Sequence, residues 1–256
     1  MTEPKYLTST KLNSALKGFH KTMASLSFNI YILIIIISIY IHFNLEREEI
    51  MNGINWTHLL TLTLSPEKGS NELKNTGNLS EALPMGIITY VAMAILTYIL
   101  ACITTSIVGY KFFTIFSFTT LLGLIFKGLL KAIIPALLAS YIFNFYCQRT
   151  YPTVNVNLPD TIKQFMYGVS VYALLVLVQN IVLMPFMIGI YTATFPYGLV
   201  RTVIFILNVL VYGWTAFTLL KLCIAEYNMS ARDTAITLVV SIVPLIVINY
   251  IIKNVF

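Results

Sequence analysis

Two pairs of side chains lie inside long apolar stretches and have residue types and spacing suited to binding chemistry. Lys127 and Lys131 are four residues apart, so they share one face of a helix, and Pro135 follows one turn later. This pair is a candidate contact for a lipid phosphate or another anion, because charge within a membrane is costly and is usually kept for a function. The alternative is that both lysines reach a membrane interface from a helix end.

Gln179 and Asn180 form the second pair, a candidate intramembrane polar site, with Pro185 shortly after them. A polar pair beside a helix break could line a cavity, as in the discontinuous helices of transporters. Such amides also hydrogen-bond to neighbouring helices, and the proline then supplies only a kink. Residues 23–126 and 132–252 show no convincing repeat, which disfavours the transporter interpretation.

Groups for catalysis are scarce over most of the chain. Between Ala82 and Ala225 there is one acid, Asp160, and no histidine. General acid–base catalysis, hard-metal sites and proton relays need carboxylates or histidines. We therefore predict no catalytic residue, no metal site and no cofactor, and a protein that is not an enzyme. Asp160 precedes a predicted helix, and we expect it to cap that helix with Lys163 nearby.

The composition predicts an all-α integral membrane protein. Hydrophobic residues make up 58% and charged residues 10% of the chain, with mean hydropathy +0.83, whereas soluble proteins carry about 25% charged residues. The net charge of +6 owes much to four lysines within residues 1–22. We expect this basic segment to form a short interfacial helix on anionic lipid headgroups at the cytoplasmic surface, and we expect no nucleic-acid partner.

Apolar runs predict one polytopic domain over residues 23–256, a helical bundle of about six transmembrane helices, with five to seven compatible. The region Phe112–Tyr146 is ambiguous, because its roughly 35 residues exceed one span while two lysines divide it. It is either one long kinked helix or two short ones. The runs are Met23–Phe43, Met85–Val108, Phe112–Tyr146, Phe165–Thr194, Leu199–Leu220 and Thr234–Ile252.

The polar region 44–84 holds six acids against three bases. Lysines before the first apolar run and glutamates after it predict a cytoplasmic N-terminus, so we expect residues 44–84 to form an acidic extracytoplasmic loop. Its centre, residues 65–78, is rich in turn-forming residues, and we expect it to be mobile.

The carboxyl half carries a pattern of helices and loops with characteristic spacing. A tryptophan-bearing span, Tyr212–Leu220, is followed by the short charged segment Ile224–Ala235 and a final apolar helix containing Pro244. Upstream, Tyr141–Arg149 and Ile162–Ala173 flank a polar loop. Over residues 130–252 this pattern resembles the Yip1 domain family of small polytopic membrane proteins. The resemblance implies a non-enzymatic protein, associated with vesicle trafficking and small GTPases in eukaryotes, and it supplies no catalytic residues.

Together these features predict a multi-pass protein that acts as a membrane scaffold or partner-binding component, with protein partners in the bilayer. We expect it in the cell membrane of a prokaryote or an endomembrane of a eukaryote. One alternative is a transporter or permease subunit that uses Gln179, Asn180, Lys127 and Lys131. Another is an accessory subunit of a larger membrane complex.

Overall fold

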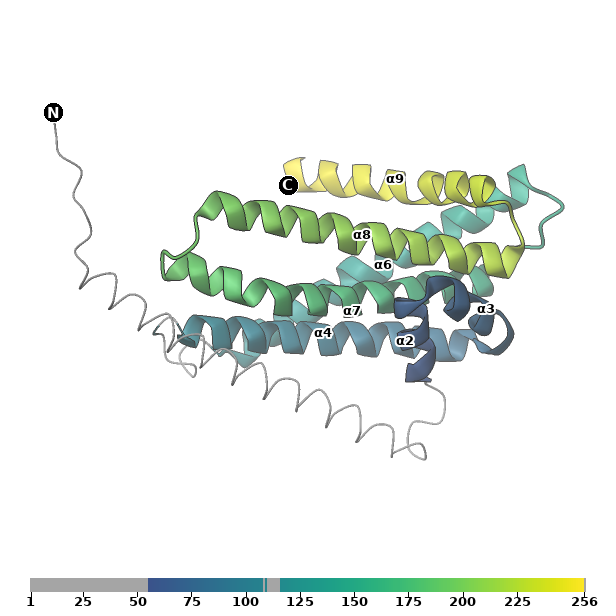
Figure 1. The fold of residues 1–256 in the computed structure, drawn as a ribbon. Coiled ribbons are helices and arrows are strands. Elements are labelled where there is room, and N and C mark those ends of the chain that lie inside the picture. The colour runs from purple at the N-terminus through teal and green to yellow at the C-terminus, as the bar shows by residue number, and fades with distance from the viewer. Residues whose placement is uncertain (1–54, 108, 110–115, 256) are drawn as a thin grey trace, which may run out of the picture. The chain divides into compact units, whose positions relative to one another are not determined.

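The computed structural model describes residues 55–107, 109 and 116–255, which belong to one compact unit spanning Gly53–Phe256 (Figure 1). These described residues form helices and connecting turns without strands, which confirms the predicted all-α fold for this part of the chain. The predicted interfacial helix within residues 1–22 and the predicted span Met23–Phe43 lie outside the described residues. The helices are α2 (Trp56–Leu64), α3 (Pro66–Thr76), α4 (Leu79–Ile107), α6 (Phe118–Thr150), α7 (Leu158–Tyr191), α8 (Tyr197–Tyr227) and α9 (Ala231–Val255).

Within the described ranges, four helices are long and apolar enough to cross a membrane: α4, α6, α7 and α8. They contain 29, 33, 34 and 31 residues. At about 1.5 Å per residue they measure about 44 to 51 Å, whereas the hydrocarbon core of a bilayer is about 30 Å thick. Each helix is therefore long enough to extend past the hydrocarbon core into the polar layers.

The ambiguous region Phe112–Tyr146 is a single helix over its described part. Helix α6 starts at Phe118, where Ser117 caps it by accepting a hydrogen bond from the Thr120 N–H, and runs to Thr150. Pro135 lies inside α6 and removes one backbone hydrogen bond, but the helix continues past it. Two short helices divided at the lysines are thus excluded.

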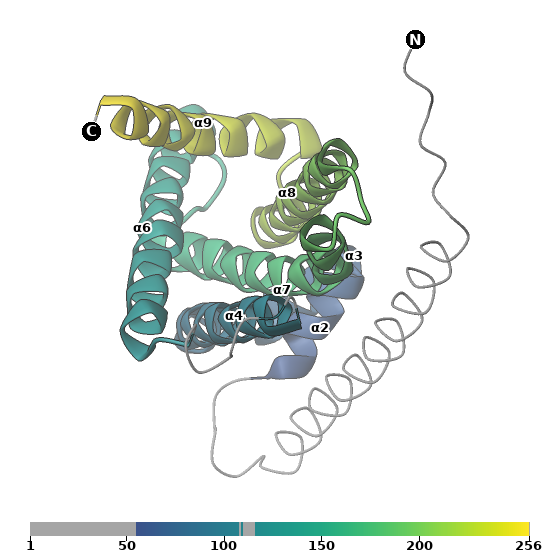
Figure 2. The same cartoon turned by 90° about the vertical axis from the view of Figure 1, so that its left-hand side faces the viewer.

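Helix α7 is the centre of the arrangement. Helices α4, α7 and α8 run side by side, while α6 crosses them obliquely and α9 lies against α6 and α8 (Figures 1 and 2). Two buried apolar clusters meet on α7. One joins it to α6, α8 and α9 around Phe143, Phe165 and Cys223, and the other joins it to α2, α3 and α4 around Leu62, Met85 and Tyr167.

Helices α2 and α3 form a hairpin, and α3 lies where the sequence predicted a turn-rich loop, so that loop prediction is wrong for residues 66–76. Pro66 occupies the first turn of α3, where its missing N–H costs nothing. Gly69 lets the two helices approach closely, since a Cβ there would lie 2.4 Å from Leu62 Cα. Apolar burial of Leu59, Leu62 and Leu73 then stabilises helices too short to persist alone.

The α2–α3 hairpin, the loop 151–157 and the turn 228–230 lie at one end of the bundle, which we call the hairpin end. Two contacts support this: Lys74 Nζ donates to Asn228 Oδ1 over 3.0 Å, and the Tyr151 hydroxyl donates over 3.2 Å to Oδ1 of Asp233, in the first turn of α9. Desolvation and the neighbouring Asp233 carboxylate raise the pKa of the Tyr151 hydroxyl, which favours its role as a donor. The turn 192–196 between α7 and α8 lies at the opposite end.

This arrangement predicts which positions share a membrane side. In a background with the buried Cys102, Cys147 and Cys223 replaced by alanine, Gln148→Cys and Asn228→Cys should react with an impermeant maleimide from the same side, because both lie at the hairpin end. Thr194→Cys should react only from the other side. Labelling of positions 148 and 228 from opposite sides would contradict the arrangement.

Candidate functional site

Lys127 and Lys131 lie together on the outward side of α6, and both are exposed. Neither takes part in a hydrogen bond or ion pair with another described residue. Between them, Gly128 packs closely on α4, because a Cβ there would lie 2.6 Å from the ring of Tyr90. The structure therefore brings the two lysines onto one face, as their spacing predicted. The contact between Gly128 and Tyr90 fixes their position along the length of α4.

Gln179 and Asn180 point to different neighbouring helices. Gln179 Nε2 donates to Asn208 Oδ1 on α8 over 2.8 Å, and Asn180 Nδ2 donates to Thr97 Oγ1 on α4 over 3.2 Å. Hydrogen bonds between membrane helices of this kind stabilise packing. The two amides hold α7 against α8 and α4, as the packing interpretation expects.

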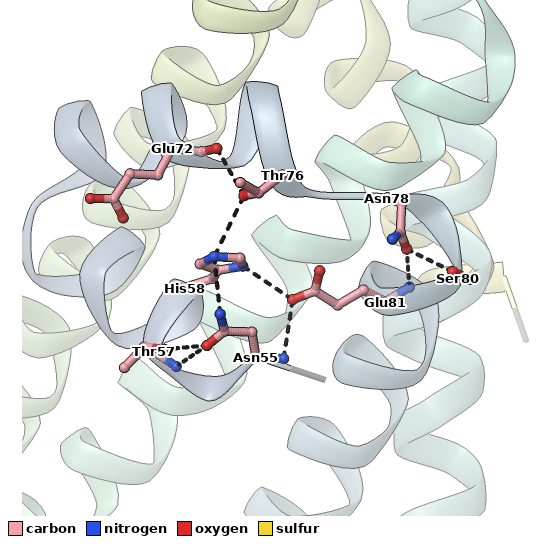
Figure 3. Close-up of polar contacts among 8 residues, drawn as sticks. All are labelled: Asn55, Thr57, His58, Glu72, Thr76, Asn78, Ser80 and Glu81. Carbon is pink, nitrogen blue, oxygen red and sulfur yellow. Dashed lines mark hydrogen bonds and ion pairs between the residues drawn. The ribbon is translucent and has the colours of Figure 1, made fainter. Parts of the chain in front are cut away.

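A histidine and a carboxylate meet at the hairpin end, between α2 and α4 (Figure 3). His58 Nδ1 lies 3.2 Å from Glu81 Oε1, and the Asn55 backbone N–H donates to the same oxygen over 3.2 Å. Glu81 is 5% exposed and sits in the first turn of α4, where Asn78 accepts a hydrogen bond from its backbone N–H. The hydroxyl of Tyr167 lies near the same carboxyl group without reaching hydrogen-bond geometry.

The hydrogen bonds around this pair fix the orientation of the imidazole. The Asn55 amide nitrogen lies 3.1 Å from His58 Nε2 and can only donate, so the neutral ring carries its proton on Nδ1 and donates it to Glu81. The Thr76 hydroxyl lies 3.5 Å from Nε2 but donates to the Glu72 carbonyl oxygen over 2.9 Å. In a hydrolytic triad the hydroxyl would donate to the imidazole instead. The group therefore ties α2, α3 and α4 together.

Three further contacts fasten the α2–α3 hairpin to α8 and the turn after it. The Trp214 indole N–H donates to the Thr63 carbonyl over 2.8 Å, and Lys221 lies 3.4 Å from Glu67. The third is the contact between Lys74 and Asn228 described above. With the His58–Glu81 pair, these contacts hold the hairpin on two sides.

A buried ionic cluster joins the start of α7 to the end of α8. Lys163 is 4% exposed, and its Nζ lies 3.0 Å from Glu226 Oε2 and 3.7 Å from Asp160 Oδ1. Gln164 Nε2 also donates to Glu226 over 2.7 Å. Because both charges of the 3.0 Å pair are largely shielded from solvent, removing one would leave the other without compensation.

The expected cap of α7 is corrected by one turn. Asn157, in extended backbone conformation, is the capping residue, and its Oδ1 accepts from the Asp160 N–H over 2.8 Å. Asp160 lies within the first turn and pairs with Lys163 as expected. Pro159 at the second helical position is compatible with this start, since its missing N–H needs no partner there.

Sequence reasoning missed the partners of these groups. His58 and Glu81 are 23 residues apart, and Gln179 and Asn208 are 29 apart. Asn208 could have been recognised from the sequence, because it is a polar residue inside an apolar run, as Gln179 is. Glu81 carried another, because Asn78 three residues earlier matches the pattern of a helix start.

Comparison with known proteins gave no match to a protein-family model, to a curated protein or to a solved structure. The resemblance of residues 130–252 to the Yip1 domain family therefore stays a prediction.

The His58–Glu81 pair predicts how the hairpin is held. His58→Ala removes one of the donors to a buried carboxylate, which should cost about 1–3 kcal/mol and speed amide hydrogen exchange in α2 by about 10- to 100-fold. Asn75→Ala, on the exposed surface of α3, is the control and should leave exchange in α2 unchanged. Equal exchange in both variants would show that the pair does not fasten α2.

The Lys163–Glu226 pair makes a second prediction. Lys163→Met should lower the unfolding free energy in detergent by about 3–5 kcal/mol, because it strands the Glu226 charge. Adding Glu226→Gln should recover part of that loss. Lys221→Met is the matched control and should cost only about 0–1 kcal/mol, because its partner Glu67 is 75% exposed. A double variant as unstable as Lys163→Met alone would contradict this account.

Proposed function

We propose that the protein is a non-enzymatic, multi-pass membrane scaffold that binds partner proteins in the bilayer. The proposal includes six transmembrane helices, with Met23–Phe43 as the first and a cytoplasmic N-terminus on anionic lipid. The hairpin end then faces away from the cytoplasm. The resemblance of residues 130–252 to the Yip1 domain family motivates a role in trafficking or membrane organisation.

The observation that carries the proposal is how polar side chains on the long helices are used. Gln179 and Asn180 bond to neighbouring helices. Buried hydroxyls donate to carbonyls one turn earlier on their own helices, as Thr89 does to Met85, and Ser170 to Met166. A transport pathway needs polar groups that face a passage. Groups committed to packing favour a scaffold over a transporter or permease subunit.

The α2–α3 hairpin supports the same proposal. It is fastened to α4 through Glu81 and to α8 through Trp214 and Lys221, so it has a defined position on the bundle. Its outward side keeps charged groups such as Lys68 and Glu72 at least partly accessible. A fixed polar surface of this kind suits recognition by another protein more than movement during a transport cycle.

The test separates the scaffold from the transporter. Purified protein in proteoliposomes should give no saturable uptake across a panel of ions, sugars, amino acids and peptides. Gln179→Leu and Asn180→Leu should each lower the unfolding free energy by about 0.6 kcal/mol, within a ceiling of about 1.7, and leave the native complex intact on a non-denaturing gel. Saturable uptake that both variants abolish would overturn the scaffold and support the transporter. Instability of the protein when it is expressed alone would favour an accessory subunit.

A further inference from the structure

One face of α6 has the spacing of a helix–helix contact but no helix on it among the described residues. Exposed side chains recur at alternating intervals of four and three residues, the average repeat of a left-handed coiled coil. We call this set the α6 seam: Lys127, Lys131, Ile134, Leu138, Tyr141 and Phe145. Its apolar members are 48–60% exposed, which is high for large side chains in the middle of a helix.

The opposite face of α6 makes the contacts with the rest of the bundle. Ala139, Phe143 and Cys147 are buried against α7, α8 and α9. Of the four long apolar helices, α6 is the least covered, with 11% of its most apolar stretch buried compared with 28% for α4 and α7. The seam therefore faces away from the described bundle.

The contact of Gly128 with Tyr90 sets the depth of the two lysines. Tyr90 lies about 17 Å from the start of α4 and about 26 Å from its end, at about 1.5 Å per residue. Wherever a hydrocarbon core of about 30 Å is placed along α4, Tyr90 falls inside it. Lys127 and Lys131 flank Gly128, so their backbones lie at hydrocarbon depth when α4 crosses the membrane.

Lipid alone does not suit the seam whether the hydrocarbon core is centred on α4 or shifted along it. With the core centred on α4, two cations face hydrocarbon, which is costly. With the core shifted toward the opposite end, the lysines reach the headgroups of the hairpin-end leaflet. The apolar seam residues from Ile134 to Phe145 continue toward the hairpin end, and they would then lie in the polar layer. A protein surface with apolar groups and counter-charges satisfies both parts.

The charges identify the occupant. A second copy of α6 would bring the same two lysines and no acid, because residues 118–150 contain no Asp or Glu. The predicted span Met23–Phe43 is uncharged. We propose that the α6 seam binds a transmembrane helix of a partner protein that carries one or two carboxylates facing Lys127 and Lys131. This inference rests on the proposed function and names the partner class.

The test uses the full chain in neutral phosphatidylcholine vesicles and a labelled single-span peptide. The peptide is a leucine–alanine helix of about 20 residues with two glutamates four residues apart at its centre. Energy transfer should show at least tenfold tighter binding than for the matched peptide with two glutamines. The double variant Lys127→Gln/Lys131→Gln should lose that preference. The control variant Arg201→Gln/Lys221→Gln removes two charges away from the seam and should keep it.

A charge reversal and a crosslink make the result specific to the seam. Lys127→Glu/Lys131→Glu should instead prefer a peptide with two lysines, and Leu138→Cys should crosslink to a cysteine in the glutamate peptide. Equal binding of the glutamate and glutamine peptides would overturn the proposal.

Three other outcomes would also overturn it. Leu138→Cys could crosslink between two copies of the chain, or it could crosslink to residues 23–43. The wild type could also enrich anionic lipid where Lys127→Gln/Lys131→Gln does not, while neither binds the peptide. Solute uptake is measured independently, so saturable uptake would overturn the proposed function while leaving the seam result readable.

Discussion

Hydrocarbon offers no hydrogen-bond partners, so each polar group on a membrane helix has to be satisfied by the protein itself. On the described helices, buried hydroxyls bond to carbonyls of their own helix, as those of Thr89 and Ser170 do, while α7 supplies polar contacts to its neighbours. Its Gln179 and Asn180 reach in two directions, to α8 and α4. Since both buried apolar clusters also include α7, polar and apolar contacts join the same helices. Among the described residues, the exposed Lys127 and Lys131 bond to no neighbouring helix, and the buried Asn144 Oδ1, Gln164 Oε1 and Tyr167 hydroxyl also lack a hydrogen-bond partner.

At the hairpin end the groups that need partners are charged side chains. At this end charged side chains pair across elements far apart in the sequence, as Lys163 does with Glu226. The burial of each ion pair decides how much it contributes to the stability of the fold. The Lys163–Glu226 pair is shielded and joins α7 to α8, whereas the Lys68–Glu72 pair on α3 is exposed and contributes little to stability.

Run length and composition were enough to predict the long helices, because a stretch of about 20 apolar residues has few alternatives to a membrane helix. They could not predict whether α6 is one helix or two, because lysines and a proline inside an apolar run are compatible with both one long kinked helix and two short helices. The α2–α3 hairpin was missed for a physical reason. Pro66 and Gly69 usually signal turns, and here they start a helix and permit close packing, a result that depends on Leu62 across the hairpin. The pairing of His58 with Glu81 is non-local and could not be read from spacing.

The hydrogen bond from the Trp214 indole to the Thr63 carbonyl has a consequence for biosynthesis. Its two ends are 151 residues apart, and the ribosome makes about 5–20 residues per second. The α2–α3 hairpin therefore waits about 8 to 30 s after its own synthesis before α8 exists to receive it. During that interval the buried cluster around Leu59 and Leu62 lacks Leu222 of α8, so the hairpin reaches its final packing only after α8 has been made.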